Sequence, residues 1–315
     1  MIDFELVAFL FPLFGMFPST IAVYFNEILT IKLEQPFATY TNVCYMTGAV
    51  GLFLLPCFSG NSNPYETSVT EILLLLLGVA SFVFHSHDSP SDSWPSVLDR
   101  LNMYVLLVFL SLHVFAGVIS TYLKRPLRDN SIAKIIILVL QSTLIILVFF
   151  YQQYIDANFL FLITGTLIFI GNCTTRWLYG MQRNFSKFDI LIGIATQSFL
   201  MLSAFLMLRH ADIHPNSYDF SHGCWHILTS IVVSTIIVTV YKGITNVDTT
   251  ERERHILILM KWFLGIIMIA LSFSSSNTLV NSTFLLSYVL IAIIITSFML
   301  IDSYKSSEAI KIFIT

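Results

Sequence analysis

Two histidines in the segment Ser221-His-Gly-Cys-Trp-His226 stand four residues apart. Residues at this spacing lie on the same face of an α-helix, one turn above the other. Such a histidine pair can hold one metal ion from a single helix. His222 and His226 are therefore the first candidate metal ligands, and a third histidine from a neighbouring helix would complete a tri-histidine site.

A second group of polar residues can supply the third ligand and the groups for catalysis. Ser81 and His85 are also four residues apart, and Asp99 follows at the start of the next predicted helix. Three histidines leave the fourth position of a zinc ion open for water, as in catalytic zinc sites. Zinc would lower the pKa of that water towards about 7. Asp99 could accept and return a proton, and Ser81 could orient the water, the substrate oxygen or Asp99 through a hydrogen bond.

Other interpretations of these histidines stay open on spacing alone. Many histidine pairs at this spacing arise by accident, and a single histidine at the end of a membrane helix is often an interfacial residue. His210 and His214 form another pair with the same spacing. Pro215 and the polar run Asp212–Asp219 favour a loop for that pair, so we expect it not to bind the metal.

The helices that position these residues are predicted to be membrane helices. The chain is 56% hydrophobic and only 11% charged, whereas a soluble domain has about 25% charged residues. A net charge of -3 offers no basic surface for nucleic acid. The four cysteines fall in or beside apolar runs and match neither a disulfide framework nor a Cys-x-x-Cys zinc site. The composition predicts an all-α polytopic membrane protein.

A membrane-spanning helix needs about 20 predominantly apolar residues, and ten segments of the chain meet this requirement. The first contains Pro12 and Pro18, which membrane helices tolerate. It follows an acidic start, unlike a secretory signal, so we expect it to be a membrane anchor. The sixth segment is short and ends in polar residues. The predicted spans are 6–25, 38–58, 69–86, 101–123, 132–151, 159–176, 188–208, 222–241, 256–273 and 280–301.

The lysines and arginines predict the orientation, because they are enriched in cytosolic loops. When the 124–128 loop is cytosolic and ten helices alternate, thirteen of the sixteen basic residues lie on the cytosolic side, the exceptions being Lys32, Arg100 and Arg209. Both termini are then cytosolic, in the plasma membrane or an endomembrane. The candidate residues gather near the outer face: Ser81, His85, Asp99, His222 and His226.

The order of these motifs resembles the CREST superfamily of membrane hydrolases. In that superfamily Ser-x-x-x-His closes one helix, Asp opens the next, and His-x-x-x-His follows five segments later. The superfamily includes alkaline ceramidases, progestin/adiponectin receptors, Per-type GPI-remodelling proteins and the transmembrane-protein-8/myomaker group. Here the motifs read Ser81-Phe-Val-Phe-His85, Val97-Leu-Asp99 and His222-Gly-Cys-Trp-His226.

Within the superfamily the chain is most similar to the transmembrane-protein-8/myomaker and Per-type branches. His85-Ser-His-Asp88 resembles their His-x-x-Asp box, and Trp225 precedes the last histidine as in both. The opening Phe11–Pro18 is similar to the start of myomaker-like chains. The resemblance divides the chain into an additional N-terminal helix, a seven-helix zinc-site core and two additional C-terminal helices, at 1–37, 38–242 and 243–315.

The resemblance implies a seven-helix bundle, with about three additional helices, in which His85, His222 and His226 bind zinc and Asp99 and Ser81 surround the water. Known members cleave lipid amide or ester bonds, sense ligands or support cell fusion. We expect a zinc-dependent hydrolase that cleaves an acyl ester or amide bond of a bilayer lipid at the extracytosolic side, like a phospholipase A or a ceramidase. The alternative is a non-enzymatic, myomaker-like membrane-remodelling or cell-fusion protein with a structural zinc site.

The orientation can be tested by labelling introduced cysteines with a membrane-impermeant thiol reagent. We predict that a cysteine in the 87–98 loop reacts from outside the cell or from the lumen, whereas one in the 124–131 loop reacts only from the cytosol. Reaction of the 87–98 loop from the cytosol alone would reverse the predicted orientation.

Overall fold

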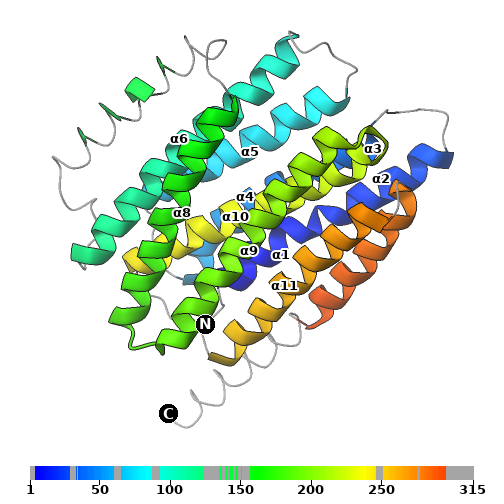
Figure 1. Ribbon diagram of the computed structural model, residues 1–315. Helices are drawn as coiled ribbons and strands as arrows, with labels where there is room; N and C mark the ends of the chain where they lie inside the picture. The colour runs from blue at the N-terminus through cyan, green and yellow to red at the C-terminus, as the bar shows by residue number, and fades with distance from the viewer. Residues whose placement is uncertain are drawn as a thin grey trace.

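The computed structural model describes residues 4–28, 33, 35–59, 65–86, 93–123, 157–245, 251–274 and 277–295, with scattered residues between 135 and 150. Every ordered element in these ranges is helical, and none of the described residues is in a strand. The helices form one bundle with their axes running roughly in one direction (Figure 1). The predicted all-α class is confirmed.

Long helices make up most of the bundle, and two short elements interrupt the regular alternation. In chain order they are α1 (Phe4–Phe14), α2 (Met16–Ile28), α3 (Pro36–Thr41), α4 (Val43–Ser59), α5 (Tyr65–Ser86), α6 (Trp94–Leu123), α8 (Ala157–Gln182), α9 (Lys187–Ile213), the 3-10 turn η3 (Pro215–Ser217), α10 (Tyr218–Thr245) and α11 (Glu251–Ser274). An unlabelled helix, Thr278–Ile295, follows α11.

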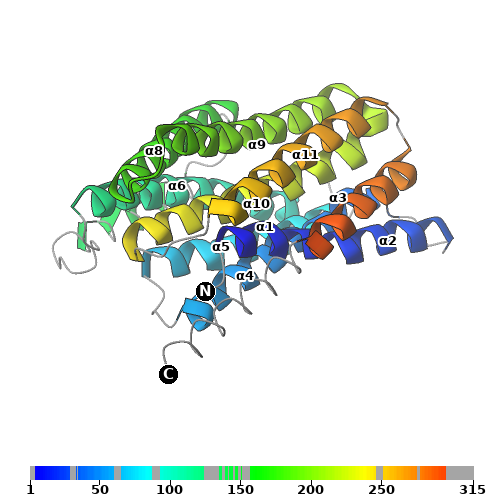
Figure 2. The ribbon, with the colours of Figure 1, turned by 90° about the horizontal axis from the view of Figure 1, so that it is seen from below.

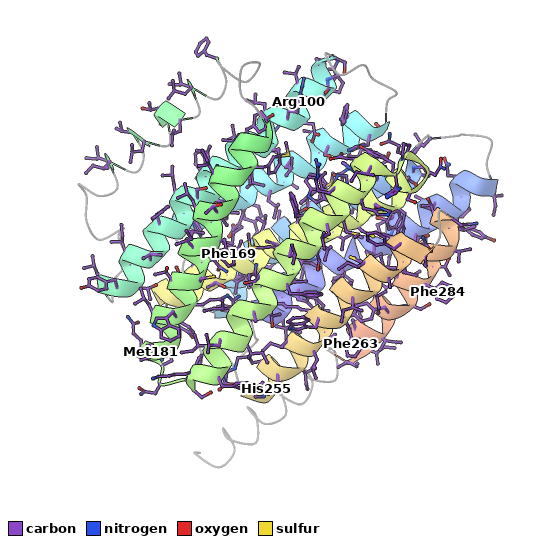
Figure 3. All side chains as sticks on the ribbon, in the orientation of Figure 1. Arg100, Phe169, Met181, His255, Phe263 and Phe284 are labelled. Atoms are coloured by element: carbon purple, nitrogen blue, oxygen red, sulfur yellow. The ribbon has the colours of Figure 1, made fainter. Side chains whose placement is uncertain are left out.

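Eight helical segments among the described residues are long and apolar enough to cross a membrane. Large apolar side chains also cover the outside of the bundle, where a soluble protein would carry charges. Phe263 and Phe284, for example, are 57% and 63% exposed and point away from the bundle (Figure 3). An apolar exterior around a fully helical backbone is the arrangement that a lipid bilayer requires. The protein is therefore a multi-pass membrane protein.

Two of the ten predicted spans do not belong to these eight segments. The segment 132–151 lies largely outside the described residues. The segment 159–176 forms the middle of α8, which is 26 residues long. Its second half carries Asn172 and Arg176, and α8 is not among the segments that meet both the length and the hydropathy requirement.

Two helices that carry candidate site residues begin earlier than predicted. α6 begins at Trp94 rather than at 101, because Pro95 suits the first turn of a helix and the Ser93 carbonyl already accepts from Val97 N at 3.0 Å. Asp99 therefore lies inside the second turn of α6 instead of opening the helix. α10 likewise begins at Tyr218 rather than at 222. Its first turn includes polar residues that a hydropathy criterion leaves out of the predicted span.

The first two predicted spans are each broken by a short irregularity. The first is divided into α1 and α2 at Gly15, and together the two helices cover Phe4–Asn26 as one apolar span. The second is divided at Asn42, which separates the six-residue α3 from α4. The two breaks lie close together in the fold, since a Cβ atom added to Gly15 would lie 2.6 Å from the backbone nitrogen of Cys44.

Helix α10 is the central helix of the bundle. It packs against α1, α3, α4, α6, α8 and α9, and it lies between the layer of α8 and α9 and the layer of α1, α4 and α5 (Figure 2). Of the 18 consecutive residues that make up its most apolar stretch, 89% are buried. A helix with apolar residues on all sides is expected in such a position. Most of the described side chains on α10 are therefore enclosed by neighbouring helices.

A Gly15→Ala substitution should destabilise the protein, because the new methyl group would meet the backbone of Cys44 rather than a movable side chain. Overpacking of this kind costs about 1–3 kcal/mol. Gly165→Ala is the matched control, since a Cβ atom there meets nothing within 4 Å. Thermal unfolding of the purified variants measures the difference. Equal unfolding temperatures for the two variants would show that α1 and α4 do not approach as closely as described.

Candidate metal centre

The three predicted metal ligands lie together at one end of the bundle. His85 is on the last turn of α5, and His222 and His226 are on the first turns of α10. Their potential ligand atoms all lie within 4.8 Å of one another. His226 is fully buried, and His85 and His222 are each 9% exposed. Among the described residues, these three histidines are grouped closely enough to hold a metal ion. The sequence predicted this group.

Helix α3 fixes the orientation of two of the three imidazole rings. His85 Nδ1 lies 2.9 Å from Gln35 Oε1, and His226 Nδ1 lies 3.1 Å from the Ala38 carbonyl oxygen. Both oxygens can only accept a hydrogen bond. Each ring therefore donates from Nδ1 and keeps a lone pair on Nε2. Histidines that bind metals commonly donate their second ring nitrogen to an oxygen in this way.

The remaining ring nitrogens include two that are buried without a partner. His226 Nε2 and His222 Nδ1 make no hydrogen bond to any residue that the structure describes. Buried polar atoms without a partner are rare, because leaving one unpaired costs about 1–3 kcal/mol. Two of them in one group of three histidines indicate that something else satisfies these lone pairs.

A metal ion fits this group with a small adjustment. Nitrogens bound to one tetrahedral zinc ion at about 2.0–2.1 Å lie about 3.4 Å from each other. Because the candidate ligand atoms lie within 4.8 Å of one another, side-chain rotations that move them by about 1 Å would suffice. Imidazole nitrogens are also ligands that zinc prefers. The donor set and its spacing are compatible with zinc.

Helix α3 is itself held against α10 by a carboxylate. Asp219, near the start of α10, accepts from Ala38 N at 2.8 Å and from Phe37 N at 3.3 Å. These N–H groups belong to the first turn of α3, where helices leave donors unsatisfied. The Phe37 ring stacks on Phe220 with centroids 5.2 Å apart. A Cβ atom on Gly223 would lie 2.4 Å from Phe37, so a glycine at this position allows α3 to approach.

Aromatic side chains enclose the histidines. Tyr218 stacks on His222 with a centroid distance of 4.8 Å and an interplanar angle of 15°. Tyr45 packs edge-on against His226 at 5.8 Å, and its hydroxyl group is hydrogen-bonded to Thr229. These rings shield the cluster from the bilayer and restrict the imidazole rotations.

Asp99 and Ser81 lie beside the cluster, although neither belongs to the group of ligands. The Ser81 side chain hydrogen-bonds to Asp99, which joins α5 to α6. Asp99 also interacts electrostatically with Tyr45 and Tyr218, the two rings that pack on His226 and His222. Asp99 is therefore a neighbour of the aromatic rings that enclose the histidines. The predicted catalytic roles of Asp99 and Ser81 stay predictions.

The second histidine pair has a different environment from the one that we expected. His210 lies in the last turn of α9, and His214 caps that helix, so the pair is not in a loop. The helix continues to Ile213 because its polar end residues cap it. His210 Nδ1 lies 2.9 Å from Ser221 Oγ, and the pair is outside the ligand group. His87 and Asp88, from the predicted His-x-x-Asp box, fall outside the described residues.

A polar cleft adjoins the cluster at the same end of the bundle. Its volume is about 730 Å³. Gln35, which contacts His85, and Tyr218, which stacks on His222, both line it. The other polar lining residues are Asn26, Asp212, Asn216, Asp219 and Thr278. The cleft is therefore separated from the histidines by single side chains.

Sequence reasoning missed the residues that orient the histidines. Gln35 is the residue before α3. Ala38 and Thr41, whose hydroxyl oxygen lies 3.2 Å from His226 Nδ1, belong to α3 itself. The predicted 38–58 span concealed this helix, and Asp219 looked like part of a loop. Pro36 directly after Gln35 was an available signal, because proline is favoured at the first position of a helix. No comparable signal marked the Ala38 carbonyl, which acts through the backbone.

Comparisons of the chain with protein-family models, with curated proteins and with solved structures found no match. The resemblance to the CREST superfamily therefore rests on its short motifs and stays a prediction. The three-histidine group is the part of the site that the geometry itself supports.

We predict one zinc ion per chain at this site. A His222→Ala/His226→Ala double variant should lose the metal, because it removes two of three ligands from one helix face. A His210→Ala/His214→Ala double variant should retain the metal, since that pair lies outside the group. Elemental analysis of the purified proteins measures both. If zinc remains in the His222→Ala/His226→Ala variant and is lost from the His210→Ala/His214→Ala variant, our assignment of the ligand pair is wrong.

Proposed function

We propose that the protein is a membrane-embedded, zinc-dependent lipid hydrolase. The substrate is a bilayer lipid, and the bond is an acyl ester or an amide, as in phospholipases A or ceramidases. The observation that carries the proposal is the group of three buried histidines. Two of its ring nitrogens have no partner among the described residues, and it lies beside a carboxylate that is bonded to a serine.

The proposed ligands are His85, His222 and His226. A zinc ion bound by these histidines would act as a Lewis acid that lowers the pKa of a water molecule and polarises a carbonyl group. Three neutral imidazole ligands would not cancel any of the positive charge of the zinc ion. A carboxylate nearby would then be favoured electrostatically, and Asp99 is the carboxylate that we propose for this role.

Asp99 is the proposed proton carrier. Its carboxylate accepts a proton from the attacking water and delivers it to the leaving oxygen or nitrogen when the acyl bond breaks. The products are a fatty acid and an alcohol or amine. Ser81 is the proposed positioning residue, since its hydrogen bond to Asp99 fixes the carboxylate. Both residues come from rigid helices, which hold such geometry better than loops do.

The surroundings of the site suit a lipid better than a soluble substrate. The polar cleft with Gln35 and Tyr218 can receive a headgroup. The acyl chains can remain in the bilayer, against the apolar side chains that cover the bundle. The distribution of lysines and arginines favours an extracytosolic position for the cleft, in the plasma membrane or an endomembrane.

We predict that Asp99→Ala abolishes hydrolysis and leaves zinc bound, because Asp99 lies outside the ligand group. General acid–base assistance contributes about 10²–10⁴-fold to a rate, so release of fatty acid or sphingoid base from bilayer lipids should fall by that factor. Ser81→Ala should reduce the rate less, since it removes one hydrogen bond. Asp88→Ala should have a smaller effect than Asp99→Ala.

The same assay separates the enzyme from its alternative. If the wild-type protein binds zinc and releases neither fatty acid nor sphingoid base from any bilayer lipid tested, the hydrolase proposal is wrong. A structural zinc site in a myomaker-like membrane-remodelling protein would then account for the histidine cluster.

A further inference from the structure

A second group of charged residues lies at the opposite end of the bundle. Glu5 on α1 lies 3.5 Å from Arg176 on α8 and 3.5 Å from Lys261 on α11. The Lys261 side chain is only 4% exposed. Thr239 of α10 lines the same region, and 17 residues of helix, or about 25 Å, separate it from His222. This charged group is therefore separate from the histidine cluster.

Figure 3 shows the separation of the two ends. Arg100, the neighbour of Asp99, lies near one end of the bundle, and Met181 and His255 lie near the other. His255 Nε2 is 3.1 Å from Asp189 Oδ1, so His255 marks the end that carries the charged group.

The charged residues surround a cavity of about 60 Å³ between α1, α8, α9, α10 and α11. About 10–15 Å³ of such space holds one water molecule, so the cavity has room for several waters or for one compact anion. Three cations and two carboxylates line it. They are Arg176, Arg254, Lys261, Glu5 and Asp189. One positive charge is left over when all five are ionised.

Two guanidinium nitrogens in this group lack a partner. Arg176 Nε and Arg254 Nε are buried and make no hydrogen bond within the part of the chain that the structure describes. The contact from Arg176 to Glu5 is also long, at 3.5 Å, compared with about 2.7–2.9 Å for a charge-assisted hydrogen bond. The Arg254 guanidinium lies 4.2 Å from the centre of the Phe185 ring.

An excess positive charge and two unpaired arginine N–H donors inside a membrane protein favour the binding of an anion. Ionisable groups between membrane helices are costly and mark binding sites by default. The planar guanidinium group matches the geometry of phosphate oxygens. We propose that this cavity binds a phosphate group, which would accept hydrogen bonds from Arg176 and Arg254 and neutralise the excess charge.

The phosphate group can come from a lipid headgroup or from free phosphate, because the cavity recognises the chemistry that both share. The distribution of lysines and arginines predicts that this end faces the cytosol. Cytosolic leaflets are rich in anionic lipids, and basic pockets between membrane helices bind their headgroups. The experiment therefore needs one arm for each source.

Binding can be measured on the full-length protein in a neutral detergent. One arm compares phosphatidic acid with phosphatidylcholine in mixed micelles by native mass spectrometry. The other compares sodium phosphate with sodium chloride at equal ionic strength by thermal unfolding. Arg176→Gln and Arg254→Gln each remove a guanidinium group from the cavity. Arg209→Gln is the matched control, since Arg209 is exposed and pairs with Asp212 at the other end of the bundle.

We expect the wild-type protein and the Arg209→Gln variant to bind at least one of the two phosphate probes. Arg176→Gln and Arg254→Gln should each weaken that binding by about tenfold or more, since each removes a charge-assisted hydrogen bond. Binding of phosphatidic acid alone identifies a lipid headgroup, and binding of inorganic phosphate alone identifies a soluble source.

Two results would overturn the proposal. In the first, neither phosphate probe binds more strongly than its comparison compound. In the second, both arginine variants bind as the wild-type protein does. Circular dichroism of each variant confirms that its helices are retained. If Arg176→Gln does not fold, Arg254→Gln decides the question, because the Glu5 contacts do not involve Arg254.

Discussion

The carboxylate of Asp219 joins α3 to α10, and the geometry of the histidine cluster depends on this link. Asp219 accepts from the first N–H groups of α3, which have no partner within their own helix. The helix is thereby placed so that the Ala38 carbonyl and the Gln35 amide meet His226 and His85. The same segment of α10 thus carries two of the candidate ligands and the group that positions the helix against which the third is oriented.

Much of the bundle and the histidine cluster could be predicted from the sequence. Long apolar segments predict membrane helices because a bilayer requires backbone hydrogen bonds within each segment. His222 and His226 are recognisable because their spacing is local. His85 could be predicted as the third ligand only because the alternation of membrane helices places the end of α5 and the start of α10 at the same face of the membrane.

Contacts that join distant parts of the chain could not be predicted in this way. The break at Asn42 lies inside the predicted 38–58 span, so α3 and α4 looked like one helix. Glu5 and Lys261 are 256 residues apart, and no periodic pattern relates them. The early start of α10 was missed because hydropathy alone does not show that Tyr218 and Asp219 serve a buried helix.

X-ray absorption at the zinc K-edge of the purified protein tests the central claim most directly, because it reports the ligands of the metal itself. Three imidazole nitrogens at about 2.0–2.1 Å, with one further light atom in the fourth position, are the predicted first shell. A sulfur ligand at about 2.3 Å, or a shell of oxygens without imidazole, would contradict the assignment of His85, His222 and His226 as the metal site.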